Sequence, residues 1–242
     1  MMFEDKKNFM FDLYGTLVDI KTDEGLPSVW NTLANYYSLK GASYNDTDLK
    51  LSYGRICAAK TLELASKRGR GRHRLSETDV EIDLLSVFKE LYNARGIDPS
   101  LKELNDTALV MRSASLLKLR LYDGAVKVLE ELKNSGRRIY LLSNAQSCFT
   151  VPELKMLGIC DYFDGIFISS QIGAKKPSQV FYDEALKGLK ASECVMIGND
   201  EFADIRGAMA AGMEACYIQT EQSPSFPVNL PSIRIDHLRD LL

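Results

Sequence analysis

The sequence predicts an α/β fold in which a doubly wound parallel sheet carries helices on both faces and an all-helical domain is inserted after the first strand. Three features favour this fold: short apolar segments recur along the chain, amphipathic helical patterns alternate with them, and one long block carries helical patterns alone. A chain of 242 residues is long enough for a core of about 150 residues plus a smaller second domain.

Five short segments have the character of buried parallel strands. Each is rich in apolar, β-branched or aromatic residues and is flanked by Gly, Asp or Asn. They cover residues 8–12, 138–143, 165–169, 194–198 and 215–218. Amphipathic helices are expected between them over 124–135, 179–189 and 202–211. Strands that alternate with helices through short links indicate a parallel sheet.

The block 19–118 interrupts this alternation. Apolar residues recur there at three- and four-residue spacing, which predicts helices only, over 26–38, 46–66, 77–95 and 100–117. We therefore expect a core made of residues 1–18 and 119–242, and a helical cap domain made of residues 19–118 that covers the core.

Composition and charge narrow the classes of partner. The chain has 45% hydrophobic and 26% charged residues, as ordinary globular proteins do. Its formal net charge of −3 gives no overall attraction to nucleic acid or to an anionic membrane, so neither is an expected partner. The strongly basic stretch 67–74 (KRGRGRHR) fits a solvated loop between two cap helices or, alternatively, a patch that steers anions. It lacks the interleaved aromatic residues that favour nucleic acid.

Cysteine usage and the N-terminus bear on the compartment. The five cysteines are odd in number and widely spaced, and only two histidines are present. This pattern predicts reduced thiols rather than disulfides or a zinc site. The N-terminal segment has charges where a signal peptide needs an apolar run, and no stretch approaches the roughly 18 apolar residues of a membrane span. We therefore expect a cytoplasmic protein.

Polar residues follow the predicted strands, at the sheet edge where open parallel sheets bind ligands. Asp12 ends the first strand ahead of a glycine turn, where a carboxylate can attack a substrate or simply cap the turn. Ser143 ends the second strand, and Lys176 lies between the third strand and the next helix. Asp200 and Asp204 follow the fourth strand. Each signal is weak alone, but together they predict an active site.

In this order and spacing, the four elements resemble the haloacid dehalogenase superfamily, whose core is Rossmann-like. The family opens with a nucleophilic Asp, any residue, usually a second Asp, and then Gly-Thr-Leu or Gly-Thr-Val; Asp12, Gly15, Thr16 and Leu17 match. The Ser-Asn pair after the second strand matches as well. So does the Lys-Pro pair before a helix, with an aromatic residue, Tyr182, six positions after the lysine. The helical insertion also lies where the family commonly carries a cap.

The resemblance implies a hydrolase that uses Asp12 as a covalent nucleophile. It implies that the Ser143 hydroxyl holds a transferring phosphoryl oxygen and that Lys176 offsets negative charge at the nucleophile and the leaving oxyanion. It further implies that Thr16 and Asn144 contact the substrate.

The resemblance also implies a Mg²⁺ ion, held by Asp12, by the main-chain carbonyl of Tyr14 and by acidic residues after the fourth strand. The family often has Gly-Asp there, with another Asp five residues on. Asn199 stands at the first of these positions and Asp204 at the second, so Asp204 is the preferred ligand, directly or through water. Asp200 is the other candidate, or else a first-turn carboxylate favoured by the helix dipole.

Tyr14 departs from the family pattern, because family phosphatases carry a second Asp there that acts as acid and base. Tyrosine has an ordinary pKa of about 10 and is a poor general base at neutral pH. Three activities stay open. The first is a Mg²⁺-dependent phosphatase acting on a small phosphorylated metabolite, in which Tyr14 donates a hydrogen bond in catalysis and another group, or solvent, handles the proton. The others are a metal-free 2-haloacid dehalogenase and a weakly active relative that binds phosphorylated ligands.

The phosphatase is the favoured alternative. The dehalogenase branch shares Tyr at this position, the Ser-Asn pair and the Tyr six residues after the lysine. Its fourth motif, however, reads roughly Ser-Ser-Asn before the Asp, whereas this chain has Gly198-Asn199-Asp200, and the extra carboxylate would repel an anionic haloacid. The Arg-containing cap segment of that branch has no counterpart between Trp30 and Arg55. In the family, the cap sets substrate specificity, and no motif within 19–118 identifies a ligand.

Overall fold

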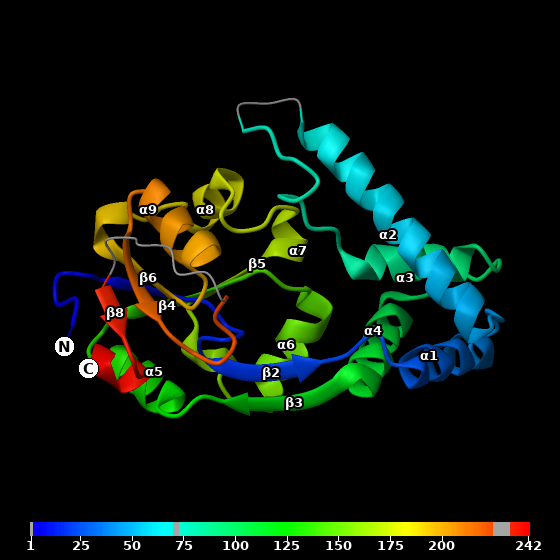
Figure 1. Cartoon of the computed structure of the whole chain (residues 1–242), viewed down its shortest axis with the longest axis horizontal. Helices are drawn as coiled ribbons and strands as arrows, with labels where there is room; N and C mark the ends of the chain where they lie inside the picture. Colours follow the sequence, from blue (N-terminus) through cyan, green and yellow to red (C-terminus); the bar gives the residue numbers. More distant parts are fainter. Residues whose placement is uncertain (1, 70–72, 225–232) are drawn as a thin grey trace.

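The computed structural model describes residues 2–69, 73–224 and 233–242. Six parallel strands form one sheet in the order β5-β4-β1-β6-β7-β8, so that the chain order reverses between β1 and β6 (Figure 1). This is the strand order of a Rossmann-like, doubly wound sheet, which confirms the predicted fold class. The strands are β1 (Asn8–Phe11), β4 (Arg138–Ser143), β5 (Gly165–Ile168), β6 (Cys194–Gly198), β7 (Glu214–Ile218) and β8 (Ile233–Ile235); only β8 was not expected.

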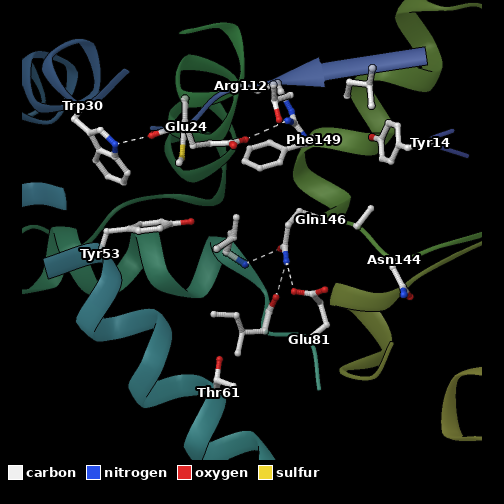
Figure 2. Close-up of a pocket in the computed structure, with 16 residues that line it drawn as sticks. Tyr14, Glu24, Trp30, Tyr53, Thr61, Glu81, Arg112, Asn144, Gln146 and Phe149 are labelled. Carbon is white, nitrogen blue, oxygen red and sulfur yellow. Dashed lines mark hydrogen bonds and ion pairs between the residues drawn. The ribbon is translucent and has the colours of Figure 1, made fainter. Parts of the chain in front are cut away.

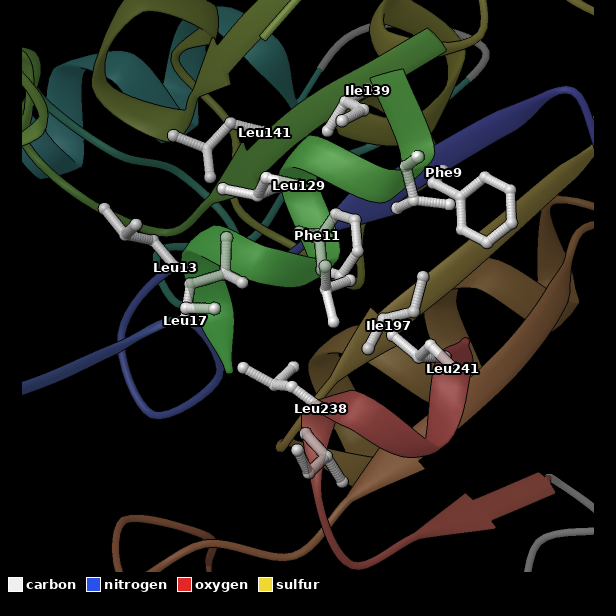
Figure 3. Close-up of a cluster of buried hydrophobic side chains, with 14 of the residues drawn as sticks. Phe9, Phe11, Leu13, Leu17, Leu129, Ile139, Leu141, Ile197, Leu238 and Leu241 are labelled. Carbon is white, nitrogen blue, oxygen red and sulfur yellow. The ribbon is translucent and has the colours of Figure 1, made fainter. Parts of the chain in front are cut away.

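Side chains of the sheet alternate between two apolar layers, as the pleat of a strand requires. Phe11 and Ile197 belong to the layer shown in Figure 3, together with Leu129 of α5. Met10 and Met196 belong to the opposite layer. Because both faces are covered, the five strands from β5 to β7 in the sheet are apolar over most of their length. The covering elements are α5 (Ala125–Asn134) and η4 (Leu238–Leu241) on the first face, and α8 (Gln179–Ala185) and α9 (Gly207–Ala210) on the second.

An antiparallel ribbon joins the sheet to the inserted block. Strand β2 (Val18–Thr22) pairs with β3 (Leu116–Leu121), and the two run side by side between the sheet and the inserted helices (Figure 1). Both ends of the block 19–118 are therefore strands, whereas the sequence predicted helices only. The buried carboxylate of Asp19 pairs with Lys118 and Arg120 across the ribbon, at 2.8 Å from each, and these pairs favour the observed register.

Four helices occupy the rest of the block and form their own apolar cluster. Phe149, from the core helix α6 (Ser147–Met156), joins this cluster beside Trp30 and Phe88 of the block. The inserted helices thus share buried surface with the core rather than standing apart from it. They are α1 (Pro27–Leu39), α2 (Asp46–Arg68), α3 (Leu84–Asn93) and α4 (Leu101–Ser115).

Several helix boundaries differ from those expected. Helix α3 begins at Leu84 and not at residue 77, because the Gln146 side chain accepts from the Leu84 main-chain N–H and donates to the Ile82 carbonyl. The helix expected over 202–211 begins as the π-helical turn η3 (Glu201–Arg206), and α8 ends at Ala185 instead of continuing to 189. The short elements α7 (Ser169–Ile172), η1 (Cys160–Tyr162) and η2 (Ala191–Glu193) were not expected.

Other expectations concern the surface and the thiols. All five cysteines are free, as their spacing predicted. Within the described residues, every helix is too short or too polar to cross a membrane. Of the basic stretch 67–74, residues 70–72 lie outside the described residues. Arg68 donates to the main-chain carbonyl of Ile172 at 2.7 Å, so the end of α2 contacts the core.

The apolar layer beneath α5 should be the main stabilising contact of that helix. Leu129 is fully buried, and Leu129→Ala should lower the free energy of unfolding by about 2–5 kcal/mol through lost burial and an unfilled cavity. Lys127→Ala, on the exposed side of the same helix, should change it by less than about 0.5 kcal/mol. Urea denaturation of both variants measures the difference. Equal unfolding free energies for the two variants would contradict the packing of Leu129 against the sheet.

Candidate active site

The sheet topology brings the predicted site residues together. β1 and β6 are neighbours at the point where the strand order reverses, which is where open α/β sheets bind ligands. A pocket of about 180 Å³ lies at the C-terminal ends of these strands. Every site residue expected from the sequence except Thr16 lines it: Asp12, Tyr14, Ser143, Asn144, Lys176, Asp200 and Asp204.

Lys176 lies between two carboxylates of this pocket. Its ammonium group donates to Asp12 Oδ1 at 2.8 Å, to Asp204 Oδ1 at 2.7 Å and to the Leu142 main-chain oxygen at 2.7 Å. The side chain is only 2% exposed, so its three N–H bonds are satisfied by protein atoms. The neighbouring Lys175 lies 3.9 Å from the carboxylate of Glu81 instead. Of the two lysines, only Lys176 therefore meets the proposed nucleophile.

Burial and charge act against each other in this cluster. Burial alone would lower the pKa of Lys176, but Asp12 and Asp204 outweigh that effect and hold its pKa above the ordinary value. Burial raises the pKa of Asp204; Lys176 opposes the rise, and Asp12 adds to it. Two carboxylates share one ammonium group, so the pocket has an excess of negative charge.

The turn after β1 holds the Asp12 carboxylate through a hydrogen bond from Thr16. Thr16 is fully buried, and its hydroxyl donates to Asp12 Oδ2 at 3.1 Å. This contact favours a role in orienting Asp12 over the substrate contact that the resemblance implied. Gly15 has φ of 87°, and a side chain at this position would overlap the Asn199 amide. The Gly-Thr sequence therefore lets the turn approach β6 closely.

Ser143 and Asn144 complete the side of the pocket at the end of β4. The Ser143 hydroxyl is buried and has no hydrogen-bond partner among the residues that the structure describes. An unsatisfied hydroxyl facing an anion site is suited to donate to a ligand oxygen. The Asn144 amide, in contrast, accepts from the Lys176 main-chain N–H at 2.8 Å and donates to the Lys176 carbonyl at 2.9 Å. Its contacts fix Lys176.

The segment after β6 carries the acidic candidates for metal binding. Asp204 accepts through one oxygen from Lys176 and through the other from the Asp200 main-chain N–H at 3.1 Å. Asp200 Oδ1 accepts from the main-chain N–H groups of Phe202 and Ala203 and so caps η3. A Cβ on Gly198 would overlap the Asp204 carboxylate, so a glycine is needed there.

The donor set of this pocket fits a hard cation. Across residues 2–69, 73–224 and 233–242, no three His, Cys, Asp or Glu side chains form a group that could hold a metal ion by themselves. Mg²⁺ commonly binds one or two carboxylates and completes its shell with waters and substrate oxygens, so it does not need such a group. The oxygen donors that line the pocket include Asp12, Asp200, Asp204 and the Asn199 amide.

Tyr14 directs its hydroxyl to α6 and not to Asp12. It donates to Glu153 Oε2, and its oxygen lies 3.0 Å from Thr150 Oγ1; both partners belong to α6. Burial and the Glu153 carboxylate raise the pKa of Tyr14 well above its ordinary value, so the phenol stays protonated. Glu153 in turn pairs with Arg112 of α4 at 2.9 Å. Figure 2 shows Arg112 beside Phe149, over whose ring the guanidinium stacks at 4.2 Å.

The sequence did not point to Glu153 or Arg112. Glu153 lies in a helix without an apolar stripe, and Arg112 follows the ordinary pattern of a surface helix, so neither carries a local signal. Both become noticeable only because the fold buries them: their side chains are 5% and 14% exposed.

Comparisons with known proteins agree with this geometry. A family model described as haloacid dehalogenase-like hydrolase matches residues 6–212. The chain belongs to this family. The match includes the turn after β1, the end of β4, Lys176 and the acidic segment after β6. Membership makes the chain a hydrolase and confirms the resemblance that the four motifs indicated.

Relatives of this haloacid dehalogenase-like hydrolase include phosphatases. It is 38% identical over 104 residues to a ribulose-1,5-bisphosphate 5-phosphatase of Halopiger xanaduensis, covering 42% of this chain and 44% of that protein. It is 28% identical over 185 residues to a glyceraldehyde 3-phosphate phosphatase of Methanopyrus kandleri, covering 69% and 79%. The first match spans less than half the length of that relative.

A solved structure shares the fold of the whole chain. The 2-haloacid dehalogenase of Pseudomonas syringae pv. Tomato superposes with a TM-score of 0.64 at 18% identity, covering 98% of this hydrolase and 96% of that chain. This likeness includes the inserted helices as well as the sheet, and it concerns the fold alone.

The shared lysine should be essential to the stability of the site. Lys176→Ala would leave Asp12 and Asp204 buried and facing each other without a cation, which should cost about 3–5 kcal/mol of unfolding free energy. Lys175→Ala removes a partly exposed neighbour and should cost less than about 0.5 kcal/mol. Chemical denaturation at neutral pH measures both. If the two variants are equally stable, Lys176 does not hold the charge cluster together.

Proposed function

We propose that the protein is a Mg²⁺-dependent phosphatase that hydrolyses a small phosphate monoester through an aspartyl-phosphate on Asp12. The observation that carries the proposal is the buried Lys176 ammonium, shared between Asp12 and Asp204 at the switch point of the sheet. The phosphatase relatives, the unsatisfied Ser143 hydroxyl and the oxygen-rich pocket support it. The division into a core, 1–18 and 119–242, and a cap, 19–118, belongs to the same proposal.

In the first step an Asp12 oxygen bonds to phosphorus while the bond from phosphorus to the alcohol oxygen breaks, and the alcohol takes up a proton and leaves. In the second step water attacks phosphorus, the bond to Asp12 breaks, and inorganic phosphate is released. Lys176 offsets the negative charge at Asp12, and the Ser143 hydroxyl donates to a phosphoryl oxygen. Thr16 and Asn144 orient Asp12 and Lys176 respectively.

Mg²⁺ would be held by Asp12, the Tyr14 carbonyl and one carboxylate after β6. When bound, it would neutralise the excess charge of the pocket and that of the phosphate. Both oxygens of Asp204 already accept from protein donors, whereas only one oxygen of Asp200 does so among the described residues. We therefore favour Asp200 as the direct ligand and give Asp204 the task of holding Lys176, which reverses the preference drawn from the sequence.

Phosphate release by the purified protein, with Mg²⁺ and with a chelator, tests the proposal directly, and Asp12→Asn tests the nucleophile. The amide is nearly isosteric but cannot attack, so turnover should fall at least about 10³-fold. The fold should survive, because Lys176 then faces the single carboxylate of Asp204. A thermal melt provides the control. Wild-type turnover by a folded Asp12→Asn variant would rule out the covalent mechanism.

Tyr14 offers the second test. Its hydroxyl is bound to α6, so Tyr14→Phe should change phosphoester turnover by less than about tenfold. Tyr14→Asp places a shorter carboxylate in the pocket and should raise turnover, since general acid–base catalysis contributes about 10²–10⁴-fold. Steady-state kinetics of both variants measures the effect. Lower turnover in a folded, Mg²⁺-binding Tyr14→Asp variant would mean that Tyr14 itself takes part in catalysis.

The same two proteins separate the alternatives. A 2-haloacid dehalogenase would release halide from 2-chloropropionate without Mg²⁺, and Tyr14→Asp would weaken that reaction by charge repulsion. A relative that only binds phosphorylated ligands would show neither reaction in either protein. Halide and phosphate release, assayed side by side, distinguish the three cases.

A further inference from the structure

A second, larger cavity opens beside the nucleophile pocket. It has a volume of about 620 Å³, within the range of small-molecule sites, and lies between the cap helices and the core. Tyr14 and Asn144 line both spaces, so the two meet at these residues. If a phosphate is bound at Asp12, as the proposed function requires, the alcohol part of the ester extends into this cavity.

The far end of the cavity is aromatic. Figure 2 shows Trp30 and Tyr53 at the end opposite Tyr14 and Asn144, with Phe149 between. Trp30 and Tyr53 pack edge to face with ring centroids 5.2 Å apart. The Trp30 indole N–H is already bound to the Glu24 main-chain carbonyl, so Trp30 offers a ligand its ring surface. Such a wall favours a flat ring on the ligand.

The charges around the cavity disfavour a second anionic group on the ligand. Arg112 is the only Lys or Arg among the lining residues that the structure describes. Its guanidinium is already paired with two carboxylates, the buried Glu153 at 2.9 Å and Glu24 at 3.5 Å. A carboxylate or second phosphate on the ligand would therefore lose its hydration without gaining an unpaired cation.

Glu81 presents an acceptor to the same space. Gln146 donates to its Oε1 at 3.0 Å, and the same amide is bound to the main chain at Ile82 and Leu84 (Figure 2). The Ser169 hydroxyl donates to its Oε2 at 3.3 Å. These contacts fix the carboxylate on the cavity wall, where its side chain stays 20% exposed. A ligand N–H or O–H group suits this position, and an anion does not.

We infer that the cavity binds a flat, ring-bearing alcohol that is uncharged or cationic and donates hydrogen bonds, as a nucleoside does, and that it disfavours alcohols with a second anionic group. The substrate class would then be monoesters of the nucleoside 5′-monophosphate type. This inference rests on the proposed phosphatase function.

The test compares three monoesters on the wild-type protein with Mg²⁺: cytidine 5′-monophosphate, glycerol 3-phosphate and 3-phosphoglycerate. The nucleotide should have the highest kcat/KM, and 3-phosphoglycerate, with its carboxylate, the lowest. Tyr53→Ala should lower kcat/KM for the nucleotide about tenfold or more, because the lost stacking of the base on an aromatic side chain has an effect of that size. It should leave kcat/KM for glycerol 3-phosphate unchanged. Tyr53→Phe keeps the ring and should retain the preference.

Two further variants complete the test. Glu81→Gln should raise kcat/KM for 3-phosphoglycerate relative to glycerol 3-phosphate, because it removes a negative charge and keeps the acceptor for Gln146. Tyr36→Ala removes an aromatic side chain of α1 that does not line the cavity, and should leave kcat/KM unchanged for all three monoesters.

The possible outcomes separate the two proposals. If no monoester is hydrolysed, the proposed function fails. If monoesters are hydrolysed but 3-phosphoglycerate has the highest kcat/KM, only the inference about the cavity is overturned. The same holds if Tyr53→Ala and Tyr53→Phe both lower kcat/KM equally for all three monoesters.

Discussion

The site depends on one constraint: a lysine ammonium is buried at the edge of the sheet and must be neutralised there. An ammonium group moved away from water is costly unless carboxylates and acceptors surround it. Asp12 and Asp204 supply the charges, and the Leu142 carbonyl supplies the third acceptor. These partners come from strand β4, the turn after β1 and the segment after β6, so the same contacts that satisfy Lys176 also fix this turn and this segment relative to β4. The position of Asp12 and the local stability therefore rest on the same bonds.

The close approach of these loops explains residues that have no chemistry of their own. Gly15 lies against Asn199, and Gly198 lies against the Asp204 carboxylate, so a side chain at either position would push apart the two sides of the pocket. Tyr182 is buried beneath the same region and donates to the main-chain oxygens of Ala203 and Asp204. The aromatic residue six positions after the lysine thus supports the π-helical turn that holds Asp204. The motif residues therefore contact one another within one small region of the structure, although they are far apart in the sequence.

The sheet and the first layer of the site were predictable because their signals are local. Buried parallel strands are apolar along their whole length, and polar residues at their ends stand out. The β2–β3 ribbon was missed although Leu119 and Leu121 alternate with Lys118 and Arg120, because this short period-2 pattern directly follows a helix. The roles of Asn144 and Thr16 could not be predicted, since they depend on which neighbour each polar group meets. Arg112 and Glu153 are far apart in sequence, and only the fold makes them partners.

Tyr14 connects the turn after β1 to the inserted helices. Glu153 is buried in α6 and needs partners, and it obtains one from the inserted helix α4, Arg112, and one from the turn after β1, the Tyr14 hydroxyl. A carboxylate at position 14 could not donate to Glu153 while ionised and would add a like charge near it. A tyrosine at position 14 can therefore donate a hydrogen bond to Glu153, whereas an ionised aspartate there would repel it. Tyr14 stands where family members usually carry a second Asp, and its hydroxyl instead bonds to α6, the helix whose Glu153 also pairs with Arg112. Arg112 of α4 is thus linked through Glu153 to Tyr14, two residues from Asp12.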